Sequence, residues 1–202
     1  MPRQTPSQTV GPYFAYGLTP EGYGRAGIGS NDLLTESTQG ERIRIEGVVY
    51  DGNGAPVSDA MLEIWQANAA GRYGHENDRE DAPLDPNFSG VGRCMTDLDG
   101  GYSFRTIRPG NYPVPSAMDR WRPAHIHFSL YGPSMLSRLV TQLYFPGDPI
   151  LSSDKVLHSV SDAAARNSLI ARYAPDVGEP GRALGYRFDI VLRDCHLARE
   201  EG

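Results

Sequence analysis

Six segments of the chain alternate apolar and polar residues with the period of two that is typical of half-buried β-strands. In RIRIEGVVY, residues 42–50, Ile43, Ile45 and Val49 share one face, and the turn sequence DGNG follows. The other five segments, each bounded by Gly, Pro, Asp or Asn, span 60–67, 101–107, 124–131, 137–145 and 185–192. Short strands separated by turn residues predict an all-β fold, and specifically a β-sandwich.

One segment, SDAAARNSLIARY, has helical rather than strand character. Ser161 is expected to cap this helix, and Asp162 suits the positive N-terminal end of the helix dipole. The alanine-rich sequence carries the predicted helix on to Tyr173. We interpret the helix as an appendage to the sheets.

The length and charge of the chain narrow the possible partners. A chain of 202 residues without a sharp shift in composition is expected to form one domain. The net charge of -6 and the absence of any Lys/Arg run disfavour nucleic acid and membrane surfaces, both of which reward clustered positive charge. A small molecule is therefore the expected ligand.

The ends and the cysteines of the chain indicate a compartment. The start, MPRQTPSQTVGPYFAYG, has no apolar core of a signal peptide, and no stretch is long and apolar enough for a membrane span. Cys94 and Cys195 lie far apart and form no CxxC motif, so we expect reduced thiols. These features predict a cytoplasmic protein.

The stretch WRPAHIHFSLYG, residues 121–132, places two histidines on one face of a predicted strand. His125 and His127 alternate with apolar residues that are expected to pack in the core, which leaves the histidine face for another task. A buried pair would repel if both rings were protonated, and a shared metal ion removes that difficulty. The HxH pattern by itself also occurs in zinc hydrolases, cupins and copper proteins, and in hydrogen-bonded structural histidines.

Tyrosines, not further histidines, are the conspicuous polar residues of the two long segments that lack strand character, 68–100 and 108–123. Tyr73 lies in GRYGHEND and Tyr112 lies in PGNYP, and long ordered loops in a compact domain often carry function. The other histidines are His75, His158 and His196. None of them stands at a recognisable ligand spacing from the pair.

The motifs GRYGHENDREDAPLDPNFSGVGRC, PGNYP, WRPAHIHFSL and TQLYFPGDP, in this order, resemble the intradiol ring-cleaving dioxygenases, and among them the protocatechuate 3,4-dioxygenase family. The likeness runs from about Ile43 to Leu192, and the combination is far more specific than any one motif. It implies a single dioxygenase domain over 1–202, with a prealbumin-like β-sandwich core at 41–193 and an N-terminal arm at 1–40.

The resemblance also implies a cofactor and a reaction. The family holds a non-haem Fe(III) ion with two tyrosines and two histidines, which fall here on Tyr73, Tyr112, His125 and His127. Protocatechuate and O2 would give 3-carboxy-cis,cis-muconate.

The resemblance assigns roles to three residues of the expected site. Tyr112 is expected to be the ligand that leaves when the substrate binds, and to accept a catechol proton. Arg122 is expected to bind the substrate and to stabilise its carbanionic character. Gln142 is expected to position substrate or O2.

The resemblance divides between the two related chains that make up protocatechuate 3,4-dioxygenases. The start, TPSQTVGPYFAYGL, is similar to an α chain, whereas the ligand-bearing middle is similar to a β chain. Gly11, Pro12 and Tyr13 would then line the pocket of a neighbouring copy in a homo-oligomer, or in a complex with a related partner chain. Val114 would also line the pocket, where the β chain usually has Trp.

Two alternatives remain open from the residues themselves. The strand pattern also suits a noncatalytic prealbumin-like binding module, which would have no reason to keep the four expected ligands together. A zinc hydrolase would need a third His, Asp or Glu ligand and a carboxylate base.

Overall fold

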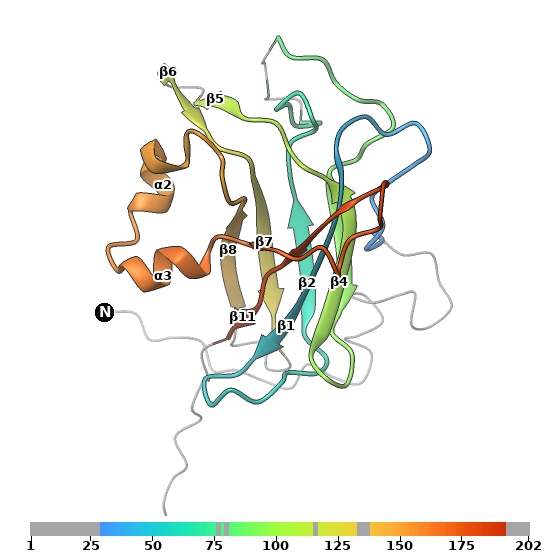
Figure 1. Ribbon diagram of the computed structural model, residues 1–202, viewed down its shortest axis with the longest axis vertical. Coiled ribbons are helices and arrows are strands. Elements are labelled where there is room, and N and C mark those ends of the chain that lie inside the picture. The colour runs from blue at the N-terminus through green and yellow to red at the C-terminus, as the bar shows by residue number, and fades with distance from the viewer. Residues whose placement is uncertain (1–28, 76–77, 79–80, 115–116, 133–137, 193–202) are drawn as a thin grey trace, which may run out of the picture.

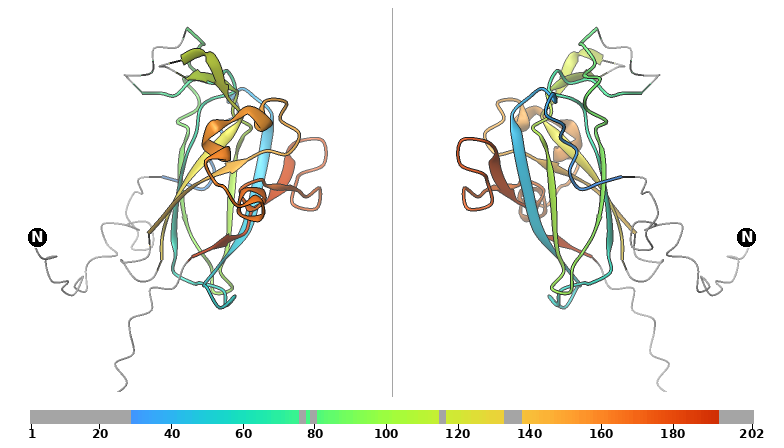
Figure 2. Two further views of the ribbon diagram at one scale, coloured as in Figure 1. Left: turned by 90° about the vertical axis from the view of Figure 1, so that its left-hand side faces the viewer. Right: turned by 90° about the vertical axis from the view of Figure 1, so that its right-hand side faces the viewer.

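The computed structural model describes residues 29–75, 78, 81–114, 117–132 and 138–192, with the side chains of 117–119 left aside. Strands dominate this part of the chain, and the few helices are short, which confirms the predicted all-β fold. Two sheets lie face to face, and the short helices lie beside them (Figures 1 and 2).

The first sheet is built around β1 (Arg42–Tyr50). Antiparallel β4 pairs along one of its edges, and on the other edge lie parallel β10 and β11, with antiparallel β9 beyond β10. The bounds of these strands are Gly101–Ile107 for β4, Arg172–Tyr173 for β9, Leu184–Arg187 for β10 and Ile190–Val191 for β11.

The second sheet has the antiparallel order β3-β2-β7-β8 and carries the histidine pair on β7. Its strands are β2 (Met61–Trp65), β3 (Val91–Met95), β7 (His125–Tyr131) and β8 (Arg138–Tyr144). A separate two-stranded ribbon, β5 (Tyr112–Val114) with β6 (Ala117–Arg122), lies beyond the start of β7 (Figure 1).

Alternating side chains of both sheets meet in the core, as the period of two predicts. Phe104 of β4 and Phe128 of β7 are fully buried and contact edge to face across the sandwich, with ring centroids 6.1 Å apart. Tyr102 packs against both rings, and its hydroxyl donates to the Phe188 carbonyl at 2.5 Å. One face of β7 therefore packs in the core, and the histidines lie on the other face.

The DGNG turn at 51–54 folds the chain back briefly against the end of β1, where Tyr50 bridges Pro56 and the Val57 N–H donates to the Val49 carbonyl at 2.8 Å. Asp51 accepts hydrogen bonds from the backbone N–H groups of Asn53 and Ala55, which holds the turn. The chain then passes to β2 in the second sheet. The turn is therefore the tight connection that the sequence allowed, and it links the two layers.

The predicted strand at 185–192 is interrupted between β10 and β11. The Asp189 carboxylate accepts from the Val48 N–H at 3.0 Å, where a backbone partner would continue the ladder. A Cβ atom on Gly47 would lie 1.9 Å from the Phe188 carbonyl oxygen, so only glycine admits this close approach of the two backbones.

The helix prediction was too long, and its cap was misplaced by one residue. Within the predicted segment only α3 (Ala163–Ser168) is helical. A 3-10 turn (Leu151–Ser153) and α2 (Lys155–His158) precede it and were not predicted. Asp162, not Ser161, caps α3, because its carboxylate accepts from the Ala165 N–H at 2.7 Å. The helix ends early because the backbone on either side of Ile170 pairs with Tyr144 of β8.

The two long segments expected as loops also contain strands, namely β3 in the first and β5 and β6 in the second. Cys94, on β3, is a free thiol whose pKa burial raises to about 12; Cys195 lies outside the described residues. Within the described chain, no helix is long and apolar enough to cross a membrane.

Candidate metal centre

The histidine pair lies at the start of β7, on the face turned away from the core. Ile126 and Phe128 are fully buried in the sandwich, which directs His125 and His127 to the opposite face. The two imidazoles meet edge to face with centroids 4.9 Å apart. His125 is almost completely buried, and His127 is partly exposed.

The His125 ring is held in one tautomer. Its Nδ1–H donates to the Pro123 carbonyl at 2.7 Å, which leaves the lone pair on Nε2. Nε2 accepts in turn from the Tyr112 hydroxyl at 3.1 Å. A backbone acceptor on one ring nitrogen and an unprotonated second nitrogen is the usual arrangement of a metal-binding histidine.

Both imidazoles are neutral at pH 7. Burial, with the Arg122 charge nearby, lowers the pKa of His125 to about 3 and that of His127 to about 4. The desolvated rings therefore favour the unprotonated form that metal coordination requires.

Two glycines bring the tyrosine loops into contact. Gly71 has φ of +83° and a Cβ there would lie 2.3 Å from the Asn111 carbonyl oxygen, while a Cβ on Gly110 would lie 2.4 Å from the Ala69 carbonyl oxygen. The Gly110 N–H also donates to the Asn68 carbonyl at 2.9 Å. The glycines of GRY and PGNYP thus permit the close backbone contact that sets the two tyrosines side by side.

Tyr73 and Tyr112 complete a cluster of four rings with the histidine pair. The tyrosine centroids are 5.6 Å apart, Tyr73 lies 6.4 Å from His127, and Tyr112 lies 5.4 Å from His125. The Tyr73 N–H is held by the Asp78 carboxylate at 2.7 Å, and this contact fixes the backbone that carries the phenol.

The phenol groups fit a strongly Lewis-acidic cation. The Tyr73 hydroxyl is buried and has no hydrogen-bond partner among the described residues, so one polar atom of the cluster is left unsatisfied. Burial raises the pKa of both phenols, and the proximity of Tyr112 raises that of Tyr73 further. A multivalent cation would offset this cost by binding the phenolates, and two phenolates with two imidazoles suit Fe(III).

The Arg122 side chain is mostly buried, although its neighbour Trp121 is exposed. Its guanidinium pairs with the buried Asp154 carboxylate at 2.9 Å and donates to Gln142 Oε1 at 2.7 Å and to the Tyr144 hydroxyl at 3.2 Å. The Tyr144 hydroxyl also donates to Gln142 Oε1 at 2.8 Å. These contacts hold one fixed positive charge beside the four rings.

Sequence reasoning missed two members of this network, Asp154 and Tyr144. Asp154 caps α2 by accepting from the Val156 and Leu157 N–H groups while it also binds Arg122. Asp is a common N-cap residue, so this role was open to prediction, whereas the contact with Arg122 depends on the fold. Tyr144 is buried, and only the fold shows that its hydroxyl joins this network.

The structure brings together the four predicted ligands, Arg122 and Gln142. Val114 lies partly buried in β5, two residues beyond Tyr112. The predicted pocket residues Gly11, Pro12 and Tyr13 lie outside the described residues, as does His196. His75 and His158 are exposed. Among the described residues, no three His, Cys, Asp or Glu side chains gather as a metal site, and the neighbours of the histidine pair are tyrosines.

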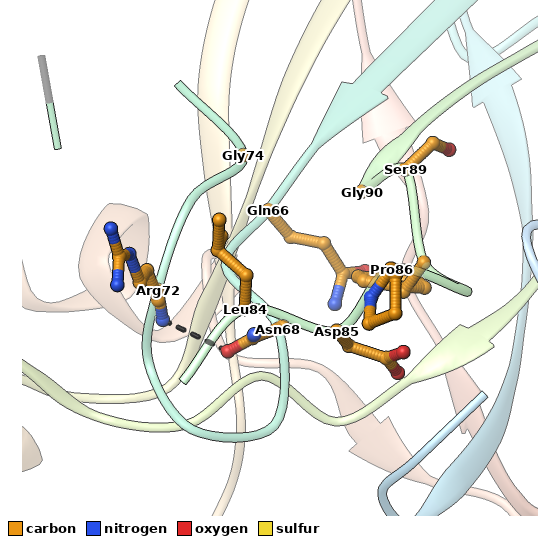
Figure 3. A pocket seen from close by; sticks show the side chains of 10 residues that line it. Gln66, Asn68, Arg72, Gly74, Leu84, Asp85, Pro86, Ser89 and Gly90 are labelled. Carbon is orange, nitrogen blue, oxygen red and sulfur yellow. Dashed lines mark hydrogen bonds between the residues drawn. The ribbon is translucent and has the colours of Figure 1, made fainter. Parts of the chain in front are cut away.

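A cavity of about 320 Å³ lies next to the loop that carries Tyr73 (Figure 3). Its lining includes Gln66, Arg72 and Gly74, the chain neighbours of Trp65 and Tyr73, but none of the four rings. The Arg72 backbone N–H donates to Asn68 Oδ1 at 3.0 Å. Figure 3 draws this bond as a dashed line. This cavity is therefore separate from the ring cluster.

Comparison with known proteins assigns the family. A family model described as dioxygenase matches residues 11–194. The chain is 58% identical to the β chain of protocatechuate 3,4-dioxygenase from Burkholderia cepacia over 154 residues, which cover 76% of this chain and 65% of that one. It is 34% identical to the α chain from the same organism over 195 residues, or 95% of this chain and 93% of that one.

Solved structures agree with this assignment. The hydroxyquinol 1,2-dioxygenase from Pseudomonas putida DLL-E4 matches with a TM-score of 0.63 and 27% identity, over 94% of this chain and 66% of that one. The chain belongs to the intradiol ring-cleaving dioxygenase family, as the motifs indicated.

The loop contact makes a prediction about Gly71. Gly71→Ala and Gly54→Ala both place a side chain at φ of +83°, but only Gly71 has the Asn111 carbonyl in the way, since nothing lies within 4 Å of a Cβ on Gly54. We expect Gly71→Ala to lower the free energy of unfolding by about 1–3 kcal/mol more than Gly54→Ala, measured by urea denaturation. Equal losses would show that the two loops part without cost.

Proposed function

We propose that this chain is an Fe(III)-dependent intradiol dioxygenase that cleaves protocatechuate to 3-carboxy-cis,cis-muconate. The observation that carries the proposal is the convergence of Tyr73, Tyr112, His125 and His127 at one end of the sandwich, with a buried phenol left without a partner among the described residues. Membership of the family supports an enzyme over the noncatalytic binding module and over a zinc hydrolase.

The reaction balances without a further reductant. Both atoms of O2 enter the product, the bond between the two hydroxylated ring carbons breaks, and each of these carbons becomes a carboxyl carbon. A bound ferric ion would supply the Lewis acidity that binds the catechol as its dianion and makes the ring reactive toward O2. The protein must hold the ion, accept the catechol protons and balance the charge on the ring.

Tyr112 is suited to proton transfer. Its hydroxyl already hydrogen-bonds His125 Nε2, and burial favours the protonated phenol when no cation is bound. A Tyr112 that leaves the metal when substrate binds would therefore take up a proton readily. Tyr73, whose hydroxyl has no alternative partner among the described residues, is the phenol that we expect to stay bound.

Arg122 is suited to stabilise negative charge on the bound ring. The Asp154 carboxylate and the Gln142 oxygen orient its guanidinium before any substrate arrives, so no reorganisation is needed during the reaction. Gln142, held by Arg122 and Tyr144, is suited to position substrate or O2.

The substrate and the partners follow from the relatives. Identity of 58% to a protocatechuate 3,4-dioxygenase β chain supports protocatechuate, although hydroxyquinol and catechol dioxygenases also match the chain. Matches to both an α and a β chain support assembly as a homo-oligomer or with a related chain. In that assembly we propose that Gly11, Pro12 and Tyr13 of a neighbouring copy, together with Val114, line the pocket.

The metal assignment predicts colour and its loss. The purified protein is expected to bind one iron per chain and to be red-brown, because phenolate-to-Fe(III) charge transfer absorbs visible light. His125→Ala and His127→Ala should lose iron and colour, whereas the exposed His158→Ala should keep both, as measured by elemental analysis and visible absorbance. Stoichiometric zinc, or colourless protein replete with iron, contradicts the proposal.

The substrate assignment predicts selectivity. With an oxygen electrode we expect the highest kcat/KM for protocatechuate, with hydroxyquinol and catechol as competitors. One O2 should be consumed per ring, and mass spectrometry with 18O2 should find both labelled atoms in the product. Preference for hydroxyquinol or catechol would keep the intradiol reaction and overturn the protocatechuate assignment.

The Arg122 network predicts a role for Asp154. Asp154→Asn keeps a good helix cap but removes the charge that orients Arg122. Turnover should fall about tenfold or more while iron and colour persist.

The matched control for Asp154 is Asp162→Asn, because Asp162 caps α3 and makes no contact with Arg122. This variant should turn over normally. Equal turnover in the two variants would remove Asp154 from the mechanism.

A further inference from the structure

Trp65 lies flat against one of the proposed ligands. The indole and the His127 imidazole are parallel to within 3°, with ring centroids 4.9 Å apart, which is an offset-stacked arrangement. The two residues are direct partners across β2 and β7, so the sheet register itself sets the contact. β2 is an interior strand, and Trp65 is paired on its other side with Val91 of β3.

The two histidines of the pair are oriented by different means. A hydrogen bond to the Pro123 carbonyl holds the His125 ring. For His127, no hydrogen bond to a ring nitrogen exists within the described chain, although a metal-binding histidine usually donates one to an outer partner. Its other ring neighbours meet it at an angle, His125 at 73° and Tyr73 at 55°. Among the described residues, the Trp65 indole is the only ring that stacks in parallel on the His127 imidazole.

We propose that Trp65 is a positioning residue that fixes the ring plane of His127 and thereby directs its ring nitrogen at the centre of the four-ring cluster. The terminal torsion of a histidine side chain has broad, roughly twofold minima, so an imidazole without a hydrogen bond rotates readily. Stacking on a rigid indole restricts that rotation and covers one face of the ring from water. This inference rests on the proposed iron site and deepens it.

The experiment compares Trp65→Leu, Trp65→Phe and Trp121→Leu with the wild type, all loaded with Fe(III). Leu removes the stacked ring, and Phe keeps a smaller one. Trp121 is the other tryptophan of the chain and is half exposed on β6, with no ring contact to the cluster among the described residues. Far-UV circular dichroism checks that each variant is folded. If Trp65→Leu does not fold, Trp65→Phe still tests the proposal.

Two readouts that do not depend on catalysis report the role of Trp65. Release of iron to a chelator, followed by loss of the visible band, should be about 10-fold faster or more in Trp65→Leu, as for other outer-shell partners of metal-binding histidines. Trp65→Phe should fall between Leu and wild type, and Trp121→Leu should match wild type. The electron paramagnetic resonance signal of the ferric ion, which reports ligand geometry, should change in Trp65→Leu.

The outcomes separate this inference from the proposed function. A wild type that binds no iron overturns the iron site itself. A coloured wild type whose iron release and resonance signal are unchanged by Trp65→Leu overturns the positioning role alone. Faster release in Trp121→Leu to the same extent would also overturn it, because the effect would then come from a general loss of aromatic packing.

Discussion

Burial of two phenols and two imidazoles at one end of the sandwich creates an electrostatic problem that the surrounding chain resolves. Desolvation raises the pKa of Tyr73 and Tyr112 and lowers that of His125 and His127, so the cluster without a cation is neutral and protonated on the phenols. Under the proposed function, a multivalent cation would replace the phenol protons and make this burial favourable. The unpartnered Tyr73 hydroxyl is the clearest sign that the cluster is incomplete by itself.

The positive charge of Arg122, beside this cluster, is stabilised by protein groups. Arg122 is mostly buried beside its buried counter-ion Asp154. Each Asp154 oxygen accepts both from the guanidinium and from a backbone N–H at the N-terminus of α2. A partly buried guanidinium that keeps a carboxylate, an amide oxygen and a phenol as partners is fully oriented. The N-terminus of α2, a helix that the sequence analysis did not predict, is thereby linked to the site through Asp154.

The sandwich supports the cluster through the alternation of β7. Each residue that this strand turns to the core fixes the direction of its neighbour, and Phe128 against Phe104 anchors that register. The paired strand β2 supplies Trp65 on the same face as His127. One face of β7 thus packs in the core and the other carries the site, and a shift of register by one residue would exchange the two faces.

The sequence by itself determined the all-β class, the separation of core and site on β7, and the motif set that places the chain in its family. Periodicity and motif order are local properties, so they are readable without coordinates. The same local reasoning misplaced the α3 cap at Ser161 and carried the helix to Tyr173, because the backbone pairing with Tyr144 that ends the helix is long-range. It also left β3, β5 and β6 as loops.

Only the tertiary structure decided which residues meet. Tyr73 and Tyr112 are brought together by Gly71 and Gly110, whose close backbone contact joins two loops that are distant in sequence. The link from Asp154 to Arg122 spans 32 residues, and the stacking of Trp65 on His127 requires the pairing of β2 with β7. Such contacts depend on strand register and on the path of the chain, which local sequence patterns do not encode. The motifs had already indicated which rings would meet.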